Sequence, residues 1–168
     1  MKTLLVLRHA KAEDAVAGSP DFDRALSERG RIQAHSVGEF IKTRNEKFDL
    51  VLSSTASRAR KTAETVISAA GLHCDIRFEQ EIYEASWQVL RTLLLEIDEA
   101  VSSLMLVGHN PGLEDLILEL TGRSEHLSPA TIAKIGFEAE QWSRVRGNSG
   151  TLDWLVSPRA SAALTVPI

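Results

Sequence analysis

The chain of 168 residues has little of what marks secreted, membrane-bound or nucleic-acid-binding proteins. Its one cysteine, Cys74, excludes an intramolecular disulfide and fits a reducing compartment. Arg8 interrupts the first apolar run after a few residues, so we expect neither a signal peptide nor a membrane-spanning segment. A formal net charge of -4 gives no basic excess for nucleic-acid binding. We therefore expect a cytoplasmic protein that binds neither nucleic acid nor membrane.

Internal repeats and low-complexity tracts are also missing. At 43% hydrophobic content the chain can bury one sizeable core, and it is too short to suggest two independent domains. We expect a single domain over residues 1–158, followed by a tail over residues 159–168.

Metal-ligand spacing is likewise absent among the histidines that lie outside the apolar runs. His35, His73 and His126 stand far apart in the sequence. His35 falls on a helix whose apolar face is better described by Ala34 and Val37, so we expect these histidines to be structural or exposed. We expect no metal and no cofactor.

Apolar runs of strand length alternate with segments of helical spacing. This pattern predicts strands at 4–7, 50–53, about 76–78 and 103–107, helices at about 27–44, 57–70, 86–99 and 112–121, and two final strands at 132–137 and 151–156. Ser27 is a candidate cap for the first helix, after an irregular stretch over 12–24 that could line a site entrance. The alternation predicts an α/β fold, a three-layer α/β/α sandwich around a central, mainly parallel sheet.

Residues suited to phosphate chemistry follow three of these strands. Arg8 and His9 come where the first run stops, and His109 comes where the run 103–107 stops. Arg58 lies in the first turn of the helix after the second strand. The carboxyl ends of parallel strands share one edge, where open α/β folds build their sites. A guanidinium offers a fork of donors to phosphate oxygens, and a neutral imidazole can attack phosphorus.

Each residue also has a purely structural interpretation. Arg8 and His9 could be a surface dipeptide at a strand end. Arg58, with Arg60 and Lys61, could form the solvated face of a helix. His109 could be a satisfied histidine at a strand end, with Asn110 capping the next helix. Three strands end in such residues: one in Arg-His, one in a Ser-rich turn that leads to Arg58, and one in Gly-His. Their joint occurrence favours a phosphoryl-transfer site over the structural interpretations.

Three stretches carry a resemblance to a known family. LRHAKA, SSTASRARKTAE and VGHNPGLEDL resemble, in order, the three signature segments of the histidine phosphatase superfamily, which includes phosphoglycerate mutases. The compact length, EIYEAS leading directly into a helix, and the ending DWLVSP are most similar to its short bacterial branch, the phosphohistidine phosphatases. The resemblance extends to about Pro158 and implies a phosphoglycerate mutase-like fold.

The resemblance also implies roles for individual residues. His9 would be the nucleophile that becomes phosphorylated, Arg8 and Arg58 would bind the phosphoryl oxygens, and His109 would complete the pocket. Two guanidiniums and an imidazole would stabilise the transferring group without a metal. Ala10 stands where the family usually has glycine, which limits the backbone if that position needs a positive φ.

The general acid is the least defined part of the resemblance. Glu81 occupies the region where larger members carry their acidic residue, Glu84 is a rival, and either could be a solvated loop carboxylate. Imidazole leaves more readily than an alkoxide, so a weak acid would favour phosphohistidine as substrate.

Chain length after Tyr83 bears on the substrate. Larger members insert a helical subdomain near the acid, whereas here the next helix follows within a few residues, which leaves the pocket open to a phosphorylated side chain on another protein. The leading hypothesis is a metal-independent phosphohistidine phosphatase acting on a protein. The alternatives are a small-molecule phosphomonoesterase or mutase of the same superfamily, acting on a small phosphate ester, and a non-catalytic module that binds phosphate or phosphoprotein.

Overall fold

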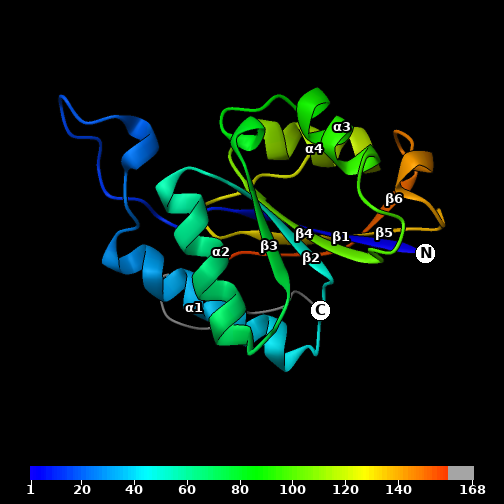
Figure 1. Ribbon diagram of the computed structural model, residues 1–168, viewed down its shortest axis with the longest axis horizontal. Coiled ribbons are helices and arrows are strands. Elements are labelled where there is room, and N and C mark those ends of the chain that lie inside the picture. The colour runs from blue at the N-terminus through cyan, green and yellow to red at the C-terminus, as the bar shows by residue number, and fades with distance from the viewer. Residues whose placement is uncertain (159–168) are drawn as a thin grey trace.

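The computed structural model describes residues 1–158, which form a central sheet with two helices on each face. The tail expected over 159–168 lies outside the described residues. Figure 1 shows α3 (Trp87–Leu95) and α4 (Gly112–Thr121) on one face of the sheet, and α1 (Glu28–Thr43) and α2 (Ser57–Ala70) on the other. The three-layer α/β/α prediction is confirmed.

The sheet has the strand order β3-β2-β4-β1-β5-β6. The strands are β1 (Lys2–Arg8), β2 (Leu50–Ser54), β3 (Asp75–Glu79), β4 (Ser103–Gly108), β5 (Ile132–Phe137) and β6 (Gly150–Val156). The first four pair in parallel, and β5 runs antiparallel to both of its neighbours. The sheet is therefore mainly parallel, as predicted, with β1 and β4 side by side at its centre.

Burial on both faces explains why β1 is an uninterrupted apolar run. Leu4 and Val6 pack into the core beneath α3 and α4, while Leu5 and Leu7 pack into the core beneath α1 and α2. All four side chains are fully buried. This packing fixes where the strand ends, and hence where Arg8 and His9 lie.

The helix that leads into the sheet from the irregular stretch is capped as predicted. The Ser27 hydroxyl accepts a hydrogen bond from Gly30 N–H, and it donates to the carbonyl oxygen of Lys11. Gly30 packs so closely on that Lys11 carbonyl that a Cβ would collide with it. The start of α1 is thus fastened to the segment just after His9.

The third helix is shorter than predicted. Apolar spacing predicts a helix to about residue 99, but α3 ends at Leu95. Asp98 accepts a hydrogen bond from Ala100 N–H and forms a turn, while Ile97 stays buried just beyond the helix. The turn at Asp98 therefore ends the helix earlier than the spacing of the apolar residues predicts. Within residues 1–158, no helix combines the length and apolar character needed to cross a bilayer.

Candidate active site

Two histidines from neighbouring strands meet at the carboxyl edge of the sheet. Arg8 pairs with Gly108 in the β1–β4 register, so His9 and His109 follow at the same level. The His9 amide donates to the Gly108 carbonyl at 3.1 Å, and the two ring centroids are 5.1 Å apart. The register of two buried parallel strands thus brings the imidazoles together.

The ring of His9 is oriented by a backbone carbonyl. Nδ1 lies 2.8 Å from the carbonyl oxygen of Ala10, which can only accept, so Nδ1 carries the proton and Nε2 is unprotonated and keeps its lone pair. Burial chiefly, and then the neighbouring His109, Arg58 and Arg8, lower the pKa of His9 to about 3, although the bond to Ala10 opposes this. His9 is therefore neutral at physiological pH, as a nucleophile must be.

Arg58 faces that lone pair. It lies in the first turn of α2, is 5% exposed, and donates from Nε to Nε2 of His9 at 3.3 Å. Thr62 ties the two segments together, because its hydroxyl donates to the Arg58 carbonyl and accepts from Ala10 N–H. Arg60, by contrast, is exposed. The solvated-face interpretation is therefore wrong for Arg58.

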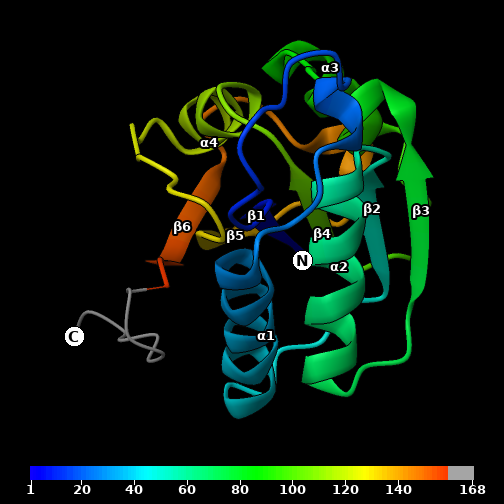
Figure 2. The same ribbon diagram turned by 90° about the vertical axis from the view of Figure 1, so that its left-hand side faces the viewer.

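Both terminal nitrogens of Arg58 are bound from the other side by one residue. Nη1 donates to the backbone oxygen of Asp21 at 2.8 Å, and Nη2 donates to its carboxylate Oδ2 at 3.0 Å. Asp21 begins the short helix η1 (Asp21–Asp23) in the irregular stretch 12–24. Figure 2 shows this stretch, in blue, passing over the amino-terminal end of α2. The stretch thus lies against the site, as the sequence suggested.

Arg8 is held by a backbone carbonyl. Its Nη1 donates to the oxygen of Leu127 at 2.8 Å, and Asn110 Nδ2 donates to the same oxygen at 2.9 Å. Asn110 also donates to Glu114 and does not cap α4, whose N-cap position is Pro111. The Asn110 cap interpretation is therefore wrong, because the amide binds the segment that carries Leu127.

His109 is bound by Ser54 at the end of β2. Its Nε2 lies 2.8 Å from Ser54 Oγ, which also accepts from Ala56 N–H. Burial first, and then Arg58, lower the pKa of His109 to about 4. Its Nδ1 is buried and has no hydrogen-bond partner within residues 1–158. A neutral imidazole with one nitrogen to spare is suited to a phosphoryl oxygen.

The acidic candidates lie apart from this cluster. Glu81 belongs to the short helix η2 (Gln80–Ile82) and is exposed, as is Glu84. Neither side chain makes a hydrogen bond or ion pair within the described part of the chain. The residue of this segment that reaches the site is Tyr83, whose ring packs edge-on against His109 at 5.5 Å.

The chain differs from the usual pattern of the family that it resembles at Ala10 and after Tyr83. Ala10 is fully buried and is not among the positive-φ residues, so its methyl causes no backbone strain. No helical subdomain follows Tyr83, because α3 begins at Trp87. His35, His73 and His126 are exposed, as expected.

The sequence pattern did not identify the residues that contact and orient the side chains of the site. Asp21, Tyr83 and Thr62 lie in no strand-end pattern, and Asp21 sits in a stretch without periodicity. Ser54 stands inside the second signature stretch, where its place at the end of β2 gave a usable signal.

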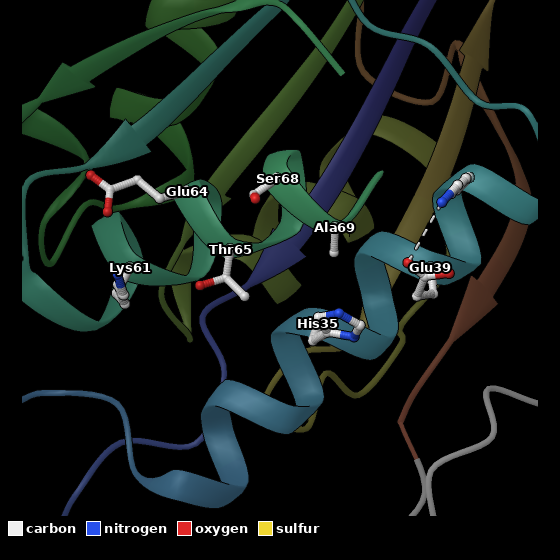
Figure 3. A pocket seen from close by; sticks show the side chains of 8 residues that line it. His35, Glu39, Lys61, Glu64, Thr65, Ser68 and Ala69 are labelled. Atoms are coloured by element: carbon white, nitrogen blue, oxygen red, sulfur yellow. Dashed lines mark ion pairs between the residues drawn. The ribbon is translucent and has the colours of Figure 1, made fainter. Parts of the chain in front are cut away.

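A separate hollow of about 610 Å³ lies over the outer faces of α1 and α2. Figure 3 shows His35 and Glu39 from α1 facing Lys61, Glu64, Thr65 and Ser68 from α2, with mixed charges. None of the strand-end residues lines it. Within residues 1–158 no group of three His, Cys, Asp or Glu side chains is arranged to hold a metal.

The chain is similar to known proteins in sequence and in fold. The family model described as histidine phosphatase superfamily (branch 1) matches residues 4–115. A phosphohistidine phosphatase SixA homolog of Haemophilus influenzae is 30% identical over 145 residues, which cover 79% of this chain and 86% of that protein. A protein of unassigned function from Mycobacterium leprae is 30% identical over 122 residues, or 69% of this chain and 71% of the relative.

Solved structures agree with the sequence matches. The proposed phosphohistidine phosphatase SixA from Agrobacterium tumefaciens superimposes with a TM-score of 0.82 at 30% identity, covering 94% of this chain and 98% of that one. The structure of a proposed α-ribazole-5'-P phosphatase from Escherichia coli has a TM-score of 0.71 at 19% identity, covering 99% of this chain and 100% of that one, so it shares the fold alone.

Proposed function

The chain belongs to the histidine phosphatase superfamily, and from that membership we propose that it is a metal-independent phosphatase that hydrolyses phosphohistidine on a protein through a phosphorylated His9. The observation that carries the proposal is the state of His9. Its Nε2 is unprotonated and buried, and it lies between the Nε of Arg58 and the ring of His109.

The reaction takes two displacements at phosphorus. First, the Nε2 lone pair of His9 forms a bond to phosphorus while the bond from phosphorus to the substrate's imidazole nitrogen breaks. The departing imidazole keeps that electron pair and leaves neutral, because its ring carries a proton. The oxygen of a water molecule then forms a bond to phosphorus while the bond from phosphorus to Nε2 breaks and its electron pair returns to Nε2. The protons of that water stay on the inorganic phosphate, which leaves.

The cationic groups stabilise the charge on the transferring group. Arg8 and Arg58 are fixed by Leu127 and Asp21, so their remaining N–H groups are preorganised for the phosphoryl oxygens. His109 Nδ1 offers a further polar contact. In this scheme no divalent ion is needed to neutralise the phosphoryl charge.

Two features support a phosphohistidine substrate. Glu81 is exposed and makes no bond to the cluster, which suits a leaving group that needs little help from an acid. The short connection between Tyr83 and α3 carries no covering subdomain, which suits a side chain presented by another protein. The related fold of small-molecule phosphatases keeps a small ester as the alternative.

The test compares kcat/KM on a phosphohistidine-bearing protein with that on a panel of sugar phosphates. We expect the phosphohistidine to be preferred, and a preference for one small ester would move the protein to the alternative.

The nucleophile is tested by trapping radiolabelled phosphate on the enzyme. His9→Ala should abolish both turnover and trapping, whereas His35→Ala, which removes an exposed histidine on α1, should change neither. A labelled adduct on His9→Ala would show that another residue is the nucleophile. Binding of phosphohistidine without turnover by the wild type would favour a binding module.

A further inference from the structure

Asp21 contacts Arg58, Tyr83 and Arg24 at the edge of the site. Its backbone oxygen accepts a hydrogen bond from Nη1 of Arg58 at 2.8 Å, and its Oδ2 accepts one from Nη2 at 3.0 Å. Oδ2 also accepts from the hydroxyl of Tyr83 at 2.9 Å, and Oδ1 pairs with Arg24 at 3.1 Å. A half-exposed carboxylate in an irregular stretch is thus fixed from three directions.

These contacts determine which part of Arg58 faces the nucleophile. With both terminal nitrogens directed to Asp21, the third nitrogen, Nε, points to Nε2 of His9. An arginine side chain has many rotamers, and a planar fork helps only when its correct edge faces the transferring group. Asp21 therefore sets the rotation of the guanidinium.

Tyr83 connects this carboxylate to the second imidazole. Its hydroxyl donates to Asp21, its ring packs edge-on against His109, and the Arg58 guanidinium carbon lies 5.9 Å from the ring centroid. Phe22, next to Asp21, packs against the same ring at 5.2 Å. The hydrogen bond from Tyr83 first, and then Arg58, keep the pKa of Asp21 below its usual value, so the carboxylate is charged at neutral pH.

We propose that Asp21, supported by the Tyr83 hydroxyl, is a positioning residue that turns Arg58 so that Nε faces the phosphoryl group on its way to His9. This inference deepens the proposed function and rests on it. Asp21 does not touch the reacting atoms and acts only through Arg58.

The charge of Asp21 gives the proposal a kinetic signature. A carboxylate beside Arg58 repels a phosphoryl dianion, so its presence weakens ground-state binding, while the orientation it imposes aids the transition state. Removing it should therefore lower kcat without raising KM. Simple damage to the fold of the site would raise KM as well.

The first measurement is steady-state kinetics on phosphohistidine for variants of Asp21. We expect Asp21→Ala to lower kcat by about tenfold or more, the equivalent of one charged hydrogen bond, with KM unchanged or lower. Asp21→Asn keeps an acceptor for Nη2 and should retain at least about a third of the wild-type kcat. The matched control is Asp23→Ala, an exposed aspartate in the same short helix, which should leave kcat within about twofold.

A double-mutant cycle tests the link to Tyr83. Tyr83→Phe keeps the ring and removes the hydroxyl, so we expect a loss of about twofold to fivefold alone. Added to Asp21→Ala it should cause no further loss, because the hydroxyl acts through the carboxylate. Additive losses, an equal loss in Asp23→Ala, or an unchanged kcat in Asp21→Ala would each overturn the proposal.

A readout without turnover separates this proposal from the phosphatase assignment. The Nε–H signal of Arg58 in ¹⁵N NMR should be sharp in the wild type and broadened in Asp21→Ala, while tungstate binding measured by calorimetry is kept or strengthened. A wild type that hydrolyses no phosphate compound would refute the proposed function, and the NMR comparison would still decide the orientation of Arg58. An Arg58 signal that is the same in both proteins would refute the positioning role.

Discussion

Acidification from pH 7 to pH 5 should destabilise the fold through its two site histidines. Both are 8% exposed and are neutral in the native state, with pKa values lowered to about 3 for His9 and about 4 for His109, chiefly by burial. In the unfolded chain the same rings titrate near 6.5. Between 6.5 and the native pKa the unfolded state binds more protons, so the stability that is complete above pH 6.5 declines as the pH falls.

The size of the effect at pH 5 depends little on the native pKa values, because both lie well below that pH. Each unit between 6.5 and the working pH costs about 1.4 kcal/mol per ring, so each histidine should lower the free energy of unfolding by about 2 kcal/mol at pH 5. The two together would remove about 4 kcal/mol from a total that is typically about 5–15 kcal/mol for a domain.

Urea unfolding at pH 7 and pH 5 measures this loss for the wild type, His9→Gln and His109→Gln. Each variant lacks one titrating ring, so its loss on acidification should be smaller than that of the wild type by about 2 kcal/mol. Equal losses in all three proteins would mean that the rings charge as readily in the native state as in the unfolded one, and the buried, neutral nucleophile would have to be abandoned. Ring ¹⁵N shifts that report a neutral His9 at pH 5 would support the same reasoning directly.

Three further outcomes concern catalysis. Arg58→Ala should lower kcat/KM on phosphohistidine by the equivalent of about 2–4 kcal/mol, and Arg58→Lys should recover little because it lacks the fork; a loss within about twofold would contradict the role. Glu81→Gln should reduce alkyl phosphate hydrolysis much more than phosphohistidine hydrolysis, and equal losses on both substrates would mean that Glu81 is no leaving-group acid. Activity should survive exhaustive treatment with a chelator, and a loss that one specific metal restores would overturn the metal-independent scheme.

Strand ends were the most predictable part of the molecule. Short apolar runs define β1 and β4, and parallel strands bring Arg8, His9 and His109 to one edge without any knowledge of side-chain contacts. The regular apolar spacing predicts the helix over Ser57–Ala70 with its bounds, and in the structure Gly71 ends that helix in a left-handed conformation. The end of α3 was missed, since local turn formation at Asp98 is not visible in apolar periodicity.

The contacts that fix the arginines could not be predicted in the same way. Asp21 meets Arg58 and Tyr83 across 37 and 62 positions of sequence, and neither Asp21 nor Tyr83 belongs to a periodic pattern. The carbonyl of Leu127 is a backbone atom, so no residue type announces that it will accept from Arg8. Arrangements of this kind depend on how irregular segments fold over a finished sheet.

The division between sheet edge and irregular segments has a consequence for how such a protein can change. His9, Arg8 and His109 are placed by buried strands, so substitutions or insertions in the short connection between Tyr83 and α3 can alter what enters the site without disturbing the reacting groups. The stretch 12–24 tolerates fewer changes, because Asp21 within it binds the guanidinium of Arg58. Substrate range can therefore evolve through a longer connection between Tyr83 and α3. Changes in the stretch 12–24 are more constrained, because those that displace Asp21 would also lower the rate of phosphoryl transfer.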